Sequence, residues 1–189
     1  MKLKRIFLCM LALALLLSGC GRSSNDDDDD DYDSSESGDS VFGSFTAKDL
    51  KGNTVDEDVF ENCELTMVNI WATFCGPCIN EMPDLGELDD AGGENFQVIG
   101  IVLDVTDPNG KVISSQKSKA EKIIDQTGAD YLHILPNEDL NDAFLGQVQV
   151  VPTTVFVDKN GNRVGEVYTG SMSKEQWESV IEDLMEEVR

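Results

Sequence analysis

Residues 71–83 decide the fold of this 189-residue chain, and they read Trp-Ala-Thr-Phe-Cys-Gly-Pro-Cys-Ile-Asn-Glu-Met-Pro. Cys75 and Cys78 stand two residues apart, after an apolar run at 65–72 and before a segment that predicts a helix. A helix N-terminus presents free backbone N–H groups and partial positive charge, so a thiol placed there ionises readily. This spacing is typical of a dithiol redox site, with Cys75 as the nucleophile and Cys78 as the resolving thiol.

A Cys-x-x-Cys pair can also be half of a zinc site, which needs two further Cys or His ligands. With the two N-terminal cysteines set aside, the chain offers Cys63 and its single histidine, His133, and neither belongs to a second close pair. We therefore expect no metal, and we expect both residues to have structural roles. For Cys63, a second disulfide or a regulatory role is the alternative. We also expect no bound cofactor, because the cysteine pair itself carries the electrons.

The motif resembles the thioredoxin superfamily. Trp-Ala-x-x-Cys-Gly-Pro-Cys is similar to the superfamily's redox motif, and Cys-x-x-Cys-x-x-Glu-x-Pro at 75–83 resembles its exported TlpA/ResA-like branch. Val151-Pro152-Thr153, before an apolar run, matches the place of the family's cis-proline. The resemblance covers about residues 43–189. It implies a thiol–disulfide oxidoreductase in which a cis bond precedes Pro152.

The resemblance also implies which residues meet the substrate. Trp71 and Phe74 would flank and shield the dithiol, although a core position is equally natural for Trp71. The backbone at Val151 would pair with an incoming substrate strand. The whole set surrounds the dithiol and comprises Trp71, Phe74, Gly76, Pro77, Val151 and Pro152. Without the dithiol, Pro152 would be interpreted as a trans proline that opens an edge strand.

Two polar side chains near the motif are candidates for proton transfer. Asn69 stands where cytosolic thioredoxins carry a buried carboxylate that assists proton transfer to the resolving thiol. A neutral amide does not suit that role, so Asn69 is expected to satisfy buried backbone groups. Glu81 lies three residues after Cys78 on the same predicted helical face, and the resembling family has an acid there. An ionised carboxylate so close would raise the pKa of the thiols. The alternative is a first-turn glutamate favoured by the helix dipole.

The N-terminus predicts export. Basic residues within the first five positions precede an apolar run at 6–17, which suits a secretory signal and is short for a bilayer span. Residues 17–20 read Leu-Ser-Gly-Cys and resemble the bacterial lipobox, which implies cleavage before Cys20 and lipidation of its thiol. Residues 1–19 would then be the signal peptide, and Cys20 would anchor the protein at the extracytoplasmic face of a bacterial membrane. An ordinary signal peptide that leaves Cys20 free is the alternative.

Residues 20–40 are acidic and include six consecutive aspartates at 26–31. Such a segment cannot bury a core and its charges repel one another, so we expect an extended, disordered tether. A calcium-binding run is the alternative, although the segment lacks the glycine turn and spaced ligands of a calcium loop. The formal net charge of −23 and the lack of a basic patch argue against a nucleic-acid partner.

Residues 41–189 have the length of one domain. The predicted elements, in chain order, are a hairpin (41–46 and 54–55), a strand (65–72), a helix from 77 or 78 to about 89 kinked at Pro83, a strand (96–105), a helix (115–127), a strand (131–135), a helix (140–145), two strands (153–157 and 163–169) and a final helix after a Ser173–Gln176 capping box. This order predicts an α/β, thioredoxin-like fold. A central mixed β-sheet is flanked by helices, with an N-terminal hairpin and a βα insertion at about 105–127.

The resemblance implies an enzyme, namely a membrane-anchored extracytoplasmic oxidoreductase that reduces disulfides of exported proteins. It implies an integral-membrane dithiol donor of the CcdA/DsbD type, and clients such as apocytochrome c or an exported methionine sulfoxide reductase. The alternative is a copper-binding chaperone on the same fold, with Cys75, Cys78 and His133 as ligands, since thiolates favour copper(I). The two-residue cysteine spacing counts against it. A peroxiredoxin would need its reactive cysteine in a different Pro/Thr context.

Overall fold

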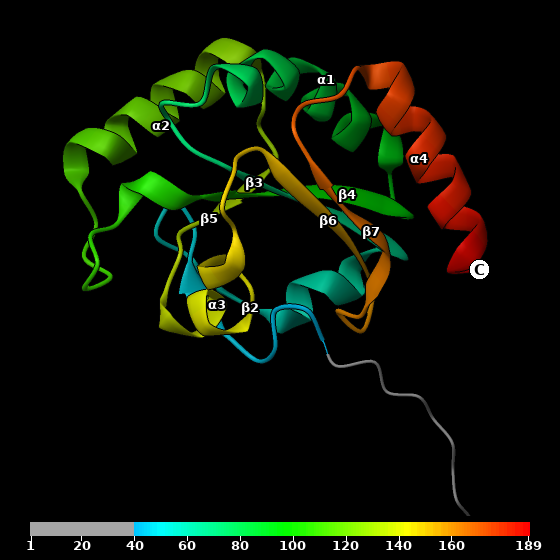
Figure 1. Ribbon diagram of the computed structural model, residues 1–189, viewed down its shortest axis with the longest axis horizontal. Coiled ribbons are helices and arrows are strands. Elements are labelled where there is room, and N and C mark those ends of the chain that lie inside the picture. The colour runs from blue at the N-terminus through cyan, green and yellow to red at the C-terminus, as the bar shows by residue number, and fades with distance from the viewer. Residues whose placement is uncertain (1–39) are drawn as a thin grey trace, which may run out of the picture. The chain divides into compact units, whose positions relative to one another are not determined.

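The structure is a computed structural model that describes residues 40–189. The predicted signal peptide, Cys20 and the aspartate run lie outside the described residues. A five-stranded sheet of order β5-β4-β3-β6-β7 forms the centre (Figure 1). Its strands are β3 (Leu65–Trp71), β4 (Phe96–Val102), β5 (Leu132–Ile134), β6 (Thr153–Asp158) and β7 (Arg163–Thr169). Strand β4 is parallel to both β3 and β5, whereas β6 is antiparallel to β3 and β7 is antiparallel to β6. The sheet is therefore mixed, as predicted.

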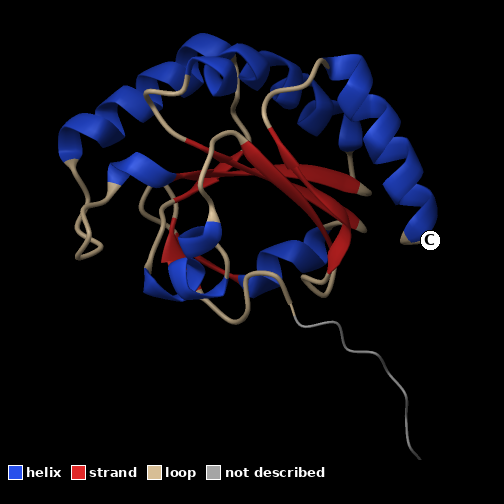
Figure 2. Ribbon diagram, in the orientation of Figure 1, coloured by secondary structure: helices blue, strands red, loops and turns tan. Residues whose placement is uncertain are grey.

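Helices cover both faces of the sheet (Figure 2). One face carries α1 (Gly76–Gly92), α2 (Ser114–Thr127) and α4 (Lys174–Glu187). The other carries the short α3 (Glu138–Ala143) and the 3-10 helix η1 (Glu57–Asn62). The remaining elements are the hairpin β1 (Thr46–Lys48) and β2 (Thr54–Asp56), and the 3-10 turns η2 (Leu103–Val105) and η3 (Leu145–Gln147). Within residues 40–189, no helix is both long and apolar enough to cross a membrane.

Strand β3 is buried along its whole length, as its apolar sequence predicts. Side chains alternate between the two faces of a strand. Leu65, Met67 and Trp71 therefore pack in the core beneath α1 and α4, whereas Val68 and Ile70 pack in the core on the α3 side. This alternation also directs Asn69 toward α1, which decides its partner in the site.

Several element boundaries differ from those expected. Helix α1 runs from Gly76 to Gly92 and includes Pro83, so it is three residues longer at its end than predicted. Strand β4 ends at Val102 because Leu103–Val105 form the turn η2, in which Asp104 leaves helical geometry. The expected helix at 140–145 is instead α3 followed by η3. The expected insertion at 105–127 contains one isolated β-bridge, between Thr106 and Val112, and then α2.

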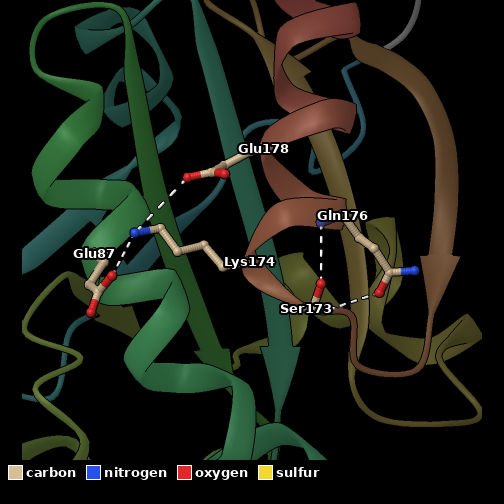
Figure 3. Close-up of polar contacts among 5 residues, drawn as sticks. All are labelled: Glu87, Ser173, Lys174, Gln176 and Glu178. Atoms are coloured by element: carbon tan, nitrogen blue, oxygen red, sulfur yellow. Dashed lines mark hydrogen bonds and ion pairs between the residues drawn. The ribbon is translucent and has the colours of Figure 1, made fainter.

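The start of α4 is held by local and tertiary contacts (Figure 3). The predicted capping box is present: the backbone N–H of Ser173 donates to the Gln176 side chain, and the N–H of Gln176 donates to Ser173 Oγ. Lys174 Nζ lies 2.5 Å from Glu87 Oε2 on α1 and 4.0 Å from Glu178 Oε1. Such ion pairs near the surface contribute little energy. The pair with Glu87 joins α4 to α1, whereas the pair with Glu178 lies within α4.

Candidate active site

The two cysteines of the motif form a disulfide at the N-terminus of α1. Cys75 is the N-cap residue, and the backbone N–H of Cys78 donates to Cys75 Sγ at 3.2 Å. Pro77 occupies the first helical turn, where its missing N–H costs no hydrogen bond. Cys78 is fully buried, while Cys75 keeps 5% of its surface exposed. Cys75 is therefore the cysteine that a partner can reach from solvent, and the roles of Cys75 as the attacking thiol and Cys78 as the resolving thiol stay predictions.

A second loop, distant in sequence, faces the disulfide. The Val151–Pro152 peptide bond is cis, as predicted, and the Val151 carbonyl oxygen lies 3.5 Å from Cys75 Sγ. The loop reaches this place because β6 pairs with β3, with Thr153 opposite Ile70 near the end that leads to the dithiol. The Thr153 hydroxyl donates to the carbonyl of Val150 and fixes the loop from within.

The surface beside the disulfide is apolar. Phe74 is 72% exposed and Val150 is 54% exposed. By contrast Trp71, predicted among the substrate-contacting residues, has no exposed surface, so it belongs to the core and that prediction is wrong. The indole at the end of β3 packs in the core and donates to His133, so it cannot reach a substrate. Gly76 has open space where a Cβ would lie, so its place is not dictated by close packing.

Glu81 is a buried acid on α1, 3% exposed. Its carboxylate accepts hydrogen bonds from Asn69 Nδ2 at 3.0 Å and from the backbone N–H of Met172 at 3.2 Å. Burial raises the pKa of Glu81, and these hydrogen bonds offset part of that rise. The Trp177 indole also lowers this pKa, although its Nε1 makes no hydrogen bond of normal geometry within the described residues. The alternative of a first-turn glutamate favoured by the helix dipole is wrong, because α1 begins at Gly76 and has no acidic residue in its first turn.

Asn69 connects Glu81 to the sheet. Its Nδ2 also donates to Thr154 Oγ1 on β6 at 3.1 Å, so the amide serves side chains and not the backbone groups that the sequence suggested. Its Oδ1 is buried without a hydrogen-bond partner in the part of the chain that is described. The amide thus holds the carboxylate in place on the face of β3 that α1 covers.

His133 and Cys63 have structural positions, as predicted. The Trp71 indole N–H donates to His133 Nδ1 at 3.2 Å, and His133 Nε2 donates to the carbonyl of Ala129 at 2.9 Å. Burial lowers the pKa of His133 to about 4, so the ring is neutral at pH 7. Since both ring nitrogens are engaged, the copper alternative loses its histidine ligand. Cys63 is a buried free thiol whose pKa is raised, first by burial.

The described residues contain no group of three or more His, Cys, Asp or Glu side chains placed to hold a metal ion. Sequence reasoning missed two contacts of the site: the Met172 backbone N–H, which donates to Glu81, and the Asp104 carboxylate, which accepts hydrogen bonds from Thr73. Each lies on an element far along the chain from its partner. The sequence placed Trp177 on the apolar face of the final helix, but the spacing of these residues along the chain does not connect them to the dithiol.

A mixed sheet with a Cys-x-x-Cys disulfide at a helix N-terminus, opposite a cis-proline loop, defines a thioredoxin-like thiol–disulfide oxidoreductase. Residues 36–185 match the Redoxin family, and the chain belongs to it. "Thiol-disulfide oxidoreductase ResA" of Geobacillus kaustophilus (strain HTA426) is 30% identical over 142 residues, which cover 74% of each chain. The enzyme is thus a thiol–disulfide oxidoreductase of the ResA type.

Solved structures share the fold. A thioredoxin-family thiol:disulfide interchange protein from Chlorobium tepidum TLS gives a TM-score of 0.62 at 22% identity, covering 75% of this chain and 93% of that one. The pneumococcal exposed lipoprotein thioredoxin (Etrx1) from Streptococcus pneumoniae strain TIGR4 gives 0.56 at 21% identity, covering 75% and 99%. These likenesses support the α/β architecture with its central mixed sheet.

Proposed function

We propose that this oxidoreductase acts outside the cytoplasm as a membrane-anchored reductant of disulfides in exported proteins. The observation that carries the proposal is the Cys75–Cys78 pair, in which the more accessible residue, Cys75, follows the exposed Phe74 and has its Sγ 3.5 Å from the Val151 carbonyl oxygen. An extended client segment can place its disulfide over Cys75 and pair its backbone with Val151. Phe74, Gly76, Pro77 and Pro152 form the rest of the contact surface.

In the reduced protein, the Cys75 thiolate attacks one sulfur of a client disulfide, forms a mixed disulfide and releases the other client sulfur as a thiolate. The Cys78 thiol loses its proton and attacks Cys75 Sγ, which releases the second client sulfur. Two electrons pass to the client, and the Cys75–Cys78 disulfide forms. A separate dithiol must then reduce this disulfide, and no bound cofactor is required.

Glu81 is proposed to accept the proton of Cys78 during this second attack. The support is its place three residues after Cys78, its burial and its raised pKa. Glu81→Gln removes the charge and keeps the shape, so the pH profile of mixed-disulfide resolution should change while the first attack by Cys75 is preserved. If the two proteins show the same pH profile, Glu81 has no such role.

The direction of electron flow is tested by equilibrating the full chain with glutathione redox buffers. A potential near that of thioredoxin, about −270 mV, supports a reductant, whereas one near about −120 mV indicates a disulfide donor. Cys78→Ser should accumulate the mixed disulfide with an oxidised protein substrate, and Cys63→Ser serves as the matched control that should not. A wild-type chain without a two-electron couple would contradict the proposed function.

The location rests on residues 1–40. The apolar run, the lipobox-like Leu-Ser-Gly-Cys and the acidic tether support lipid anchoring through Cys20. The fold likeness to an exposed lipoprotein thioredoxin is compatible with it. In bacterial cells the wild type should incorporate labelled palmitate and sediment with membranes, and Cys20→Ala should do neither. Equal labelling of both proteins would exclude Cys20 as the anchor.

The partners proposed are a membrane dithiol donor of the CcdA/DsbD type, and clients such as apocytochrome c or an exported methionine sulfoxide reductase. A donor on the membrane suits an anchored enzyme, because the tether keeps both at the same surface and raises their effective concentration. Co-expression of such a carrier should keep Cys75 and Cys78 reduced in cells. A redox state that is independent of the carrier would argue for another donor.

A further inference from the structure

Asp104, just after β4, binds the loop that precedes the dithiol. Its Oδ1 accepts the backbone N–H of Thr73 at 2.9 Å, and its Oδ2 accepts the Thr73 hydroxyl at 2.5 Å. Gln116 Nε2, on α2, donates to the same Oδ2 at 3.0 Å. We call this set of three residues, Thr73, Asp104 and Gln116, the Asp104 clamp. The clamp joins Thr73, in the dithiol loop, to residues near both ends of the segment 103–116.

The clamp acts on the turn that presents Cys75. The backbone N–H of Cys75 donates to the carbonyl of Ala72 at 3.0 Å, which places Thr73 and Phe74 at the centre of a tight turn. Thr73 is buried at 2% exposure, whereas the next residue, Phe74, is 72% exposed. With its amide and hydroxyl both bound to one carboxylate, Thr73 cannot rotate without breaking two hydrogen bonds. The clamp therefore fixes the direction in which Phe74 and Cys75 leave the turn.

The clamp also brings a charge to the dithiol loop. Each donor to Asp104 is neutral, and Asp104 takes part in none of the ion pairs of residues 40–189. Of the other segments at the site, 148–153 and 170–173 contain no ionisable side chain, while α1 carries five acidic residues, of which Glu81 is buried. A negative charge bound to Thr73, two residues before the N-cap Cys75, opposes the partial positive charge that stabilises a thiolate at the helix N-terminus.

We propose that Asp104 is a positioning residue for the dithiol: it orients the Thr73–Phe74 turn for client docking, and its charge disfavours the Cys75 thiolate and so keeps the couple reducing. The second effect follows because a less stable thiolate makes the reduced state less stable, and the dithiol then gives up its electrons more readily. The inference rests on the proposed function and concerns the same site.

The experiment compares the full chain with Asp104→Asn, Thr73→Val and Asp107→Asn. Asp104→Asn removes the charge, and the glutathione equilibrium constant should shift about fivefold toward the reduced dithiol, which is about 20 mV for a two-electron couple. Iodoacetamide should alkylate its Cys75 several-fold faster at about pH 6. Asp107→Asn removes a nearby charge in the same connection and should leave both quantities unchanged, since an amide oxygen can still accept the turn bonds of Asn109 and Lys111.

Thr73→Val separates geometry from charge. It keeps the Asp104 carboxylate but removes one clamp bond, so the equilibrium constant should change less than twofold while kcat/KM for a protein disulfide falls about fivefold. The proposal is overturned if Asp104→Asn alters thermal stability alone, or if Asp107→Asn shifts the equilibrium equally. Should Asp104→Asn not fold, an unchanged kcat/KM in Thr73→Val overturns the positioning role. Absence of exchange by the wild type would contradict the proposed function, whereas the alkylation comparison would still test Asp104.

Discussion

Acid should destabilise the protein through its single histidine, and the structure sets the size of the effect. His133 is 5% exposed, accepts the Trp71 indole N–H and has a pKa lowered by burial to about 4, against an ordinary value of 6.5. Because the unfolded chain takes up the proton first, stability is complete above about pH 6.5 and is lost as the pH falls toward 4. The full shift corresponds to about 3 kcal/mol, and the interval from pH 7 to pH 5 to about 2 kcal/mol.

The assay is urea unfolding of the oxidised protein at pH 7 and pH 5, for the wild type and His133→Asn. The asparagine Oδ1 can accept the Trp71 N–H but does not titrate, so this variant should be less stable overall yet lose about 2 kcal/mol less than the wild type between the two pH values. Glu81, whose raised pKa acts in the opposite direction, is present in both proteins and cancels. The sole histidine also gives one assignable NMR signal, which should not titrate between pH 7 and pH 5.

Equal losses of stability in the two proteins would refute the neutral, buried histidine. A histidine NMR signal that titrates near pH 6.5 in the folded protein would also refute the neutral, buried histidine, independently of the unfolding data. Either result would mean that the ring is hydrated or mobile, and the two hydrogen bonds to Trp71 and Ala129 would no longer explain its position.

Four further substitutions test packing, charge and capping. Gly100→Ala would place a Cβ 2.3 Å from His133 Nδ1, so we expect it to lower the free energy of unfolding by urea by about 2–4 kcal/mol. Gly76→Ala, whose Cβ would enter open space, should change stability by less than about 0.5 kcal/mol. Similar losses in the two variants would contradict the close packing of Gly100 against His133. Glu81→Gln should be relatively more stable at pH 8 than at pH 5, because the raised pKa of Glu81 makes the ionised form unfavourable in the folded state; a constant difference from wild type would argue against this. Ser173→Ala should cost about 1 kcal/mol through the lost cap, and an unchanged midpoint would mean that the capping box contributes nothing.

Much of the fold could be predicted because its signals are local. The apolar run of β3, the two strands expected at 153–157 and 163–169, and the Ser173 capping box all appeared where their patterns place them. Boundaries were less accurate where a side chain ends an element through a distant contact. Strand β4 stops at Val102 and is followed by the turn η2, in which Asp104 accepts a hydrogen bond from Thr73, and no periodicity in residues 96–105 reports that bond.

The sequence by itself determined the chemistry of the site: a two-residue cysteine spacing at a helix start and a proline before an apolar strand are readable from residue order alone. Only the tertiary structure decided which side chains tune it. Burial of Trp71, the raised pKa of Glu81 beside Asn69, and the neutral state of His133 all depend on desolvation and on hydrogen bonds between residues far apart in the chain. Such effects arise when β3, α1 and β5 pack together, because removal from water, and not residue type, sets the cost of a charge.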